Sequence, residues 1–86
     1  MLYKVYIVEC ADKTLYTGST KLLGRRAMEH NLSARGAKYT SRKRPVKLVY
    51  YETFATLKEA LRREYEIKSW KRWQKLDLIN SHKKVL

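Results

Sequence analysis

The stretch 2–8 (LYKVYIV) constrains the fold more than any other part of this 86-residue chain. It is rich in β-branched and aromatic residues, which predicts a strand buried on both faces. The polar stretch 11–14 suits a turn, and residues 15–18 then predict a short return strand. If the turn centres near residue 11 or 12, Tyr6 and Tyr16 lie about opposite each other in the hairpin.

The middle of the chain predicts one helix, one loop and one strand. Ser19 and Thr20 can cap a helix that runs over about 21–31, where apolar residues follow a helical stripe. Residues 33–44 are polar, basic and without periodicity, which indicates a loop. The run 46–51 (VKLVYY) predicts the third strand.

The last third of the chain predicts two helices. Thr56 and Glu59 form a capping box, so a helix should begin there, and residues 70–79 predict a second, shorter one. The expected buried face of the first of these helices comprises Leu57, Ala60, Leu61 and Ile67. The order β-β-α-β-α-α indicates an α+β fold, a small three-stranded, mainly antiparallel sheet flanked by helices, in a single domain over 1–86.

Charge restricts the class of partner. Twenty Lys and Arg oppose eight Asp and Glu, for a formal net charge of +12. Such an excess on a short chain favours a polyanion, usually DNA or RNA, with an anionic membrane as the other candidate. Because no window approaches the roughly 18 apolar residues of a membrane helix, we expect no membrane partner. The one cysteine, Cys10, excludes an internal disulfide and is compatible with a reducing, cytoplasmic setting.

Glu64 is the residue that fits a bland core least. Its helical neighbours Ala60, Leu61 and Ile67 are apolar, so its carboxylate lies in or beside the buried stripe. A carboxylate there is costly unless it is paired or bound to a metal. An ion pair with an adjacent arginine is the plainer interpretation, although side chains at i and i+1 do not face each other.

Three other pairs carry a structural and a functional interpretation each. Arg26 and His30 share a helical face at i and i+4, which suits either a solvated basic surface or phosphate binding. Tyr6 and Tyr16 suit packing more often than chemistry. The tryptophans within 68–75 (KSWKRWQK) suit base stacking or, for at least one of them, packing on the core.

The loop predicted over 33–44 concentrates cations and hydroxyl groups. Cations neutralise phosphates, and hydroxyls add hydrogen bonds to them, so this loop favours phosphate contact over a merely solvated surface. The expected nucleic-acid-binding residues are Arg35, Lys38, Tyr39, Arg42, Lys43 and Arg44.

Taken together, these positions resemble the GIY-YIG nuclease family over almost the whole chain. Tyr6 matches the tyrosine of the first family motif, although the preceding Gly and Ile are replaced. Tyr16, followed by Thr17 and Gly18, matches the second motif ten residues later. Asn80 does not align clearly with the family's late asparagine.

The remaining likeness lies in the helices and in the basic loop. Arg26 with His30 looks like the helix-borne pair of the family, and Glu64 looks like its metal-binding glutamate. The likeness is closest to small stand-alone bacterial members. The stretch 36–40 and the basic residues after it are also similar to the nuclease domain of a eukaryotic structure-specific endonuclease that cuts branched DNA.

The resemblance implies a metal-dependent DNA endonuclease. Glu64 would hold Mg²⁺ or Mn²⁺, since hard carboxylate oxygens suit a hard ion. Arg26 would stabilise charge on the phosphoryl oxygens. Tyr16 would act as general base with Tyr6 supporting it, and His30 would contact phosphate or relay a proton.

Two rival functions share the same charge. One is a nucleic-acid-binding module that does no chemistry, and the other is an adaptor or a subunit that needs a protein partner, for example in DNA repair. The basic composition does not separate DNA from RNA. An enzyme should gather the five residues Tyr6, Tyr16, Arg26, His30 and Glu64 around one concave, basic site.

Overall fold

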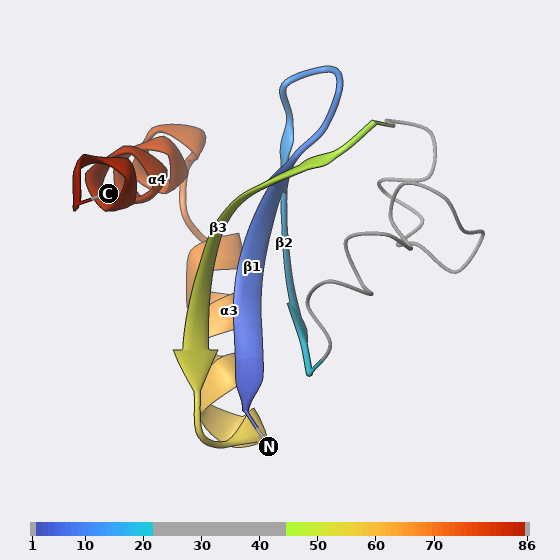
Figure 1. Ribbon diagram of the computed structural model, residues 1–86, viewed down its shortest axis with the longest axis vertical. Helices are drawn as coiled ribbons and strands as arrows, with labels where there is room; N and C mark the ends of the chain where they lie inside the picture. Colours follow the sequence, from blue (N-terminus) through green and yellow to red (C-terminus); the bar gives the residue numbers. More distant parts are fainter. Residues whose placement is uncertain (1, 22–44, 86) are drawn as a thin grey trace.

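A computed structural model describes residues 2–21 and 45–85. Within these ranges the chain forms three strands and two helices: β1 (Tyr3–Glu9), β2 (Leu15–Thr20), β3 (Lys47–Phe54), α3 (Leu57–Lys68) and α4 (Arg72–Val85). Figure 1 shows α3 running along one face of the sheet, with α4 beyond β3. The expected α+β class and antiparallel sheet are confirmed. The helix predicted over 21–31 and the loop over 33–44 lie almost entirely outside the described ranges.

The sheet has the strand order β2-β1-β3, with both pairs antiparallel. Its central strand is buried on both faces, as its composition predicts, because Val5, Ile7 and Val8 expose no surface. Val5 and Ile7 pack against Ala60 and Ile67 of α3. Val8 packs on the other face with Cys10, which is buried as a small apolar side chain.

The hairpin register differs from the expected one by two residues. Tyr6 pairs with Gly18, and Tyr16 pairs with Val8, so the two tyrosines are not directly opposite. The Cys10 amide donates to the Thr14 carbonyl at 2.8 Å, which encloses a three-residue loop centred on residue 12. The last loop residue, Lys13, has φ of 72°, the left-handed conformation that such loops use.

Helix α3 begins where its cap predicts and buries a narrower face than expected. Thr56 is the N-cap, and its side-chain oxygen accepts from the Glu59 amide at 3.2 Å. Ala60 and Ile67 are buried, whereas Leu57 and Leu61 remain 47% and 49% exposed. The prediction for these two leucines was wrong, because the helix rests on the sheet along the narrow line through Ala60 and Ile67.

Helix α4 begins two residues later than expected and extends further. The Trp70 amide donates to the Ile67 carbonyl at 3.0 Å, so Trp70 belongs to the turn that closes α3. The Gln74 side chain then accepts from the Lys71 amide at 2.9 Å, which satisfies a donor at the start of the new helix. Within 2–21 and 45–85, no helix is both long and apolar enough to cross a membrane.

Candidate active site

Glu64 is held by two side chains from different parts of the chain. Its side chain is 16% exposed. One oxygen, Oε1, accepts from the Ser19 hydroxyl of β2 at 2.6 Å, and the other, Oε2, lies 2.7 Å from Lys68 Nζ. The prediction that Glu64 lies beside the buried stripe is therefore confirmed. Its ion-pair partner is Lys68 at i+4, one helical turn away, rather than an adjacent arginine.

Helix α3 is also attached to the sheet on the side away from Ser19, through Glu52 of β3. Val5 of β1 pairs with Ser19 of β2 and with Glu52 of β3, so the three residues form one row that faces α3. Arg63 donates to Glu52 from Nε and from Nη2, both at 2.9 Å. Because Arg63 and Glu64 are neighbours, this bidentate pair fixes the turn of α3 that presents Glu64.

Electrostatic coupling around Glu52 strengthens this attachment. Burial of the Glu52 carboxyl favours its neutral form, but hydrogen bonds from Arg63 and Tyr50 outweigh burial and hold its pKa below the ordinary value. Burial, together with the hydrogen bond to Glu52, raises the pKa of Tyr50 to about 12. The bonds to Glu52 raise the pKa of Arg63. At neutral pH the cluster therefore consists of a carboxylate, a neutral phenol and a guanidinium.

Tyr6 and Gly18 form a close pair on the opposite face of the sheet. Tyr6 is 2% exposed. A Cβ atom built on Gly18 would lie 2.6 Å from the Tyr6 hydroxyl oxygen and 2.7 Å from Cζ, closer than real Cβ contacts. Glycine at this position therefore makes the space in which the Tyr6 phenol lies across β2.

Tyr16 lies on the same face as Tyr6, one diagonal step along the hairpin. Diagonal neighbours in a sheet lie within reach of long side chains. Lys68 connects Tyr16 to the glutamate, because its Nζ is 5.9 Å from the centre of the Tyr16 ring while it contacts Glu64. Since β2 is an edge strand, the candidate site wraps around that edge of the sheet.

Three of the five residues expected at the site are described, and two of them, Tyr16 and Glu64, meet at this edge, whereas Tyr6 is buried on the sheet face opposite α3. Lys68 lies between Tyr16 and Glu64, and Tyr6 packs on Gly18, the residue that precedes Ser19 in β2. The other expected positions lie outside the described residues: Arg26 and His30, and the loop residues Arg35, Lys38, Tyr39, Arg42, Lys43 and Arg44.

Ser19 and Lys68 are the two site residues that the sequence reasoning missed. Ser19 was expected to cap a helix, but it lies within β2 and donates its hydroxyl to Glu64, so that assignment was wrong. No local pattern indicates a contact across 45 positions. Lys68 had a detectable signal, since Glu followed by Lys at i+4 is the favourable order for a helical ion pair.

The donor set suits a cation that needs few protein ligands. Among the side chains that the structure describes, no group of three or more His, Cys, Asp and Glu gathers. Mg²⁺ usually keeps several waters and binds one or two carboxylates together with substrate phosphates. Glu64, half-buried and facing an ammonium group, fits that role once Lys68 moves aside. It does not suit a tight structural zinc site, which takes four ligands.

Several proteins are similar to this chain in sequence, and one solved structure is similar to it in fold. A UPF0213 protein from Staphylococcus epidermidis is 56% identical over 75 residues, covering 87% of this chain and 90% of its own. One from Staphylococcus saprophyticus is 54% identical over 76 residues, covering 88% and 92%. The solution structure of a UPF0213 protein from Bacillus halodurans aligns with a TM-score of 0.60 and 42% identity, over 93% of this chain and 84% of that one.

The family model described as the GIY-YIG catalytic domain matches residues 2–77. This span includes every element from β1 to the first half of α4, and with them Tyr6, Tyr16 and Glu64. The match agrees with the resemblance carried by the two tyrosine motifs and the glutamate. The chain therefore belongs to the GIY-YIG family, whose domain is that of a nuclease superfamily.

Proposed function

We propose that this protein is a DNA endonuclease that hydrolyses phosphodiester bonds with the help of Mg²⁺ or Mn²⁺. The observation that carries the proposal is the placement of Glu64, a half-buried carboxylate held by Ser19 at the edge strand that also presents Tyr16. A net charge of +12 supports a polyanionic substrate.

Each residue of the site has a distinct part in the proposed mechanism. Glu64 would hold the cation through an oxygen that Lys68 now occupies, with Ser19 fixing the carboxylate. When bound, the cation supplies positive charge at the phosphate and at the leaving oxygen. Tyr16 accepts the proton of the attacking water, and Tyr6, packed over Gly18, supports the position of that strand.

The residues outside the described ranges complete the proposal. Arg26 stabilises negative charge on the phosphoryl oxygens, and His30 contacts phosphate or relays the proton away. We further propose that branched DNA is cut in preference to linear duplex, that the protein acts in DNA repair in the cytoplasm, and that a protein partner adds specificity.

Cleavage by a Glu64→Gln variant tests the proposal. Wild type and variant are incubated with labelled branched, duplex and single-stranded DNA in Mg²⁺, Mn²⁺ or EDTA. We expect cleavage only with a cation, and at least about a 100-fold slower rate in the variant, because the metal contributes several kcal/mol to the barrier. Glu59→Gln, at an exposed position in the first turn of the same helix, keeps a side-chain oxygen for the Thr56 hydroxyl and is the matched control; it should cleave at the wild-type rate.

Two outcomes would count against the proposal. Cleavage that survives Glu64→Gln would remove Glu64 from the site. Absence of cleavage by both proteins, with salt-sensitive DNA binding by both, would instead favour a binding module or an enzyme that requires a partner.

A further inference from the structure

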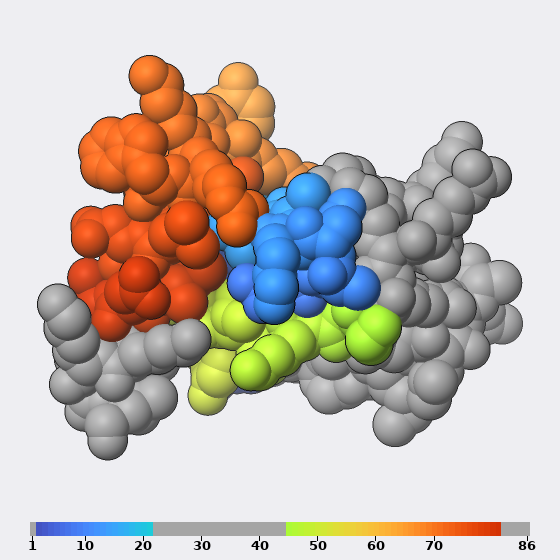
Figure 2. Space-filling model, turned by 90° about the horizontal axis from the view of Figure 1, so that it is seen from above, coloured from blue at the N-terminus to red at the C-terminus, as the bar shows by residue number. Residues whose placement is uncertain are grey.

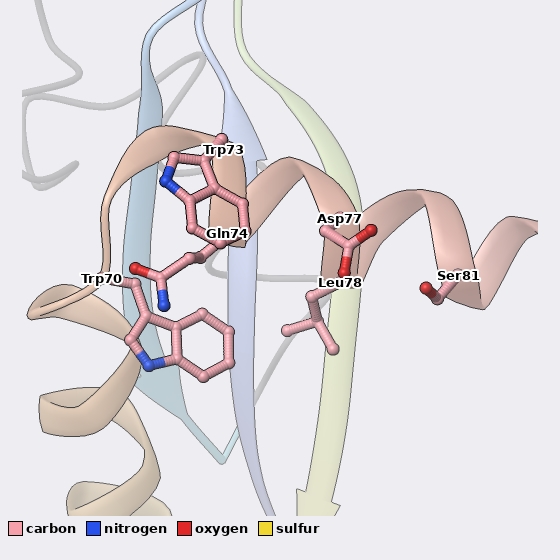
Figure 3. Close-up of a pocket in the computed structure, with 6 residues that line it drawn as sticks. All are labelled: Trp70, Trp73, Gln74, Asp77, Leu78 and Ser81. Carbon is pink, nitrogen blue, oxygen red and sulfur yellow. The ribbon is translucent and has the colours of Figure 1, made fainter.

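A groove runs along the start of α4, and none of the residues placed around Glu64 lines it. Its volume is about 290 Å³, and its lining comprises Trp70, Trp73, Gln74, Asp77, Leu78 and Ser81. The residues at i and i+4 along α4 face the same side, and Figure 3 shows Gln74 between the two indole rings in that view. Small-ligand pockets usually span roughly 300–1,000 Å³, so this groove lies at the small end and has room for a small planar group such as one nucleobase.

The two indoles of the groove differ in how firmly they are held. Trp70 packs against the main core, and the Arg63 guanidinium carbon lies 5.1 Å from the centre of its ring. Trp73, in contrast, is 66% exposed. Tryptophan is highly buried on average, so an indole that leaves two-thirds of its surface in solvent beside a groove indicates a binding role.

The polar groups of the groove match the edge of a base. The Gln74 side-chain oxygen already accepts from the Lys71 amide, so its NH₂ group is the end that donates to a ligand. The Asp77 carboxylate accepts hydrogen bonds. A nucleobase presents donors and acceptors on its edge and a π-face to an indole, and it does so fully only when unpaired.

Charge decides between a nucleic acid and other occupants. Lys71, Arg72 and Lys75 lie beside the groove in the chain, and the whole protein carries +12. A second copy would bring the same charge against it, whereas a phosphate backbone is attracted. Figure 2 shows the end of α3 and the start of α4, in orange, as a projecting corner beside the β1–β2 hairpin.

We propose that this groove binds an unpaired base of single-stranded DNA, which stacks on Trp73 against the wall formed by Trp70. The inference rests on the proposed function for the identity of the polymer and deepens it, because the substrate then needs a single-stranded segment. Lys68, which touches Glu64, is two residues before Trp70, so the groove lies at the same end of α3 as the carboxylate.

Binding measured in EDTA, where no cleavage occurs, separates the contribution of base stacking to the affinity from that of charge. The affinity of wild type, Trp73→Ala and Trp73→Phe is measured by fluorescence anisotropy on labelled oligothymidylate, on an abasic strand of equal length and on blunt duplex. Because Trp73→Ala loses the stacking surface, its affinity for oligothymidylate should be about 5- to 100-fold lower than that of wild type. Trp73→Phe, which retains an aromatic face, should bind within about threefold of wild type. Both variants should bind the abasic strand and the duplex as wild type does.

Three results would overturn the inference. The first is that Trp73→Ala binds oligothymidylate as tightly as wild type does. The second is that it loses as much affinity for the abasic strand as for oligothymidylate. The third is that the wild type sediments as a dimer and Trp73→Ala as a monomer, which would make the groove an interface between two copies. Binding of an RNA strand alone would overturn the assignment to DNA. Failure of the proposed function remains distinguishable, because the Glu64→Gln assay reports cleavage, which EDTA excludes from these measurements.

Discussion

At the scale of single residues, Lys68 has the largest consequence for the chemistry. Its ammonium group lies 2.7 Å from Glu64 Oε2, where the positive charge of a divalent cation would otherwise act. Ser19 occupies the other carboxylate oxygen with a neutral hydroxyl. A cation that binds Glu64 must therefore displace Lys68, whose exposed side chain is free to swing towards solvent or a phosphate.

Lys68→Met should consequently tighten cation binding. Exposed ion pairs are worth up to about 1 kcal/mol, so the apparent affinity for Mn²⁺ should rise by up to about fivefold. Titration followed by electron paramagnetic resonance of free Mn²⁺ measures it. Lys58→Met, in the first turn of the same helix, removes the same net charge. An equal increase in both variants would show that net charge, and not contact with Glu64, controls the affinity.

Gly18 decides the local geometry of the hairpin because it has no side chain. Gly18→Ala would place a methyl carbon 2.6 Å from the Tyr6 hydroxyl oxygen, and the buried ring has little room to move. Overpacking of this kind lowers the free energy of unfolding by roughly 1–3 kcal/mol. Urea unfolding measures it, and the cost should shrink in a Tyr6→Leu background, where the ring is absent. Equal costs in both backgrounds would contradict the contact.

At the scale of elements, the position of α3 on the sheet sets the position of Glu64. The helix is attached through Ser19 on one side and through Glu52 on the other, while Ala60 and Ile67 pack between them. Its apolar contact line is narrow, since the leucines at 57 and 61 stay exposed. The polar attachments therefore contribute much of what orients this helix.

Acid should weaken this attachment in a predictable direction. The pKa of Glu52 is lowered from its ordinary value of 4.5, because the bonds from Arg63 and Tyr50 outweigh burial. The stabilisation is fully present above that ordinary value and is lost as pH falls through the lower pKa of the folded state. Glu52→Gln should flatten the loss of unfolding free energy below pH 4.5, measured with urea at several pH values. Glu59→Gln, which is exposed, should leave the pH profile steep.

At the scale of the whole molecule, charge is the property that couples the site to a substrate. Lys and Arg outnumber Asp and Glu by twenty to eight, and five of these cations lie within residues 35–44, the predicted basic loop. Each phosphate neutralised adds about 0.9 to the slope of log affinity against log salt for duplex DNA. The basic loop should therefore contribute a separate part of the salt dependence.

Replacing Arg42, Lys43 and Arg44 by Gln should lower that slope by up to about 2.7, if each cation contacts one phosphate. Anisotropy of labelled duplex at increasing salt, in EDTA, gives the slope. A second triple variant at the exposed positions Lys13, Lys58 and Arg62 removes the same charge elsewhere. If both triple variants lower the slope equally, the loop has no special contact with DNA.

Sequence by itself determined the described strands, the start of α3 and the unusual position of Glu64. The strand at 2–8, the hairpin, the cap at Thr56 and the choice of Glu64 all follow from patterns that span a few residues. Such patterns are local, because backbone preference, capping and the repeat of side chains along a helix or strand depend on neighbouring residues alone. The match of the family model to residues 2–77 confirms the resemblance to the GIY-YIG family on which the choice of Tyr6 and Tyr16 rests.

Only the tertiary structure decided which distant groups meet. The hairpin register depends on which residue lies at the centre of the loop. A centre at residue 11 would pair Tyr6 with Tyr16, whereas the observed centre at residue 12 pairs Tyr6 with Gly18. The contact between Ser19 and Glu64 joins positions 45 residues apart, so it exists only because α3 packs across the sheet near β2. Local preference cannot encode such contacts, because they follow from how complete elements exclude water and fill space together.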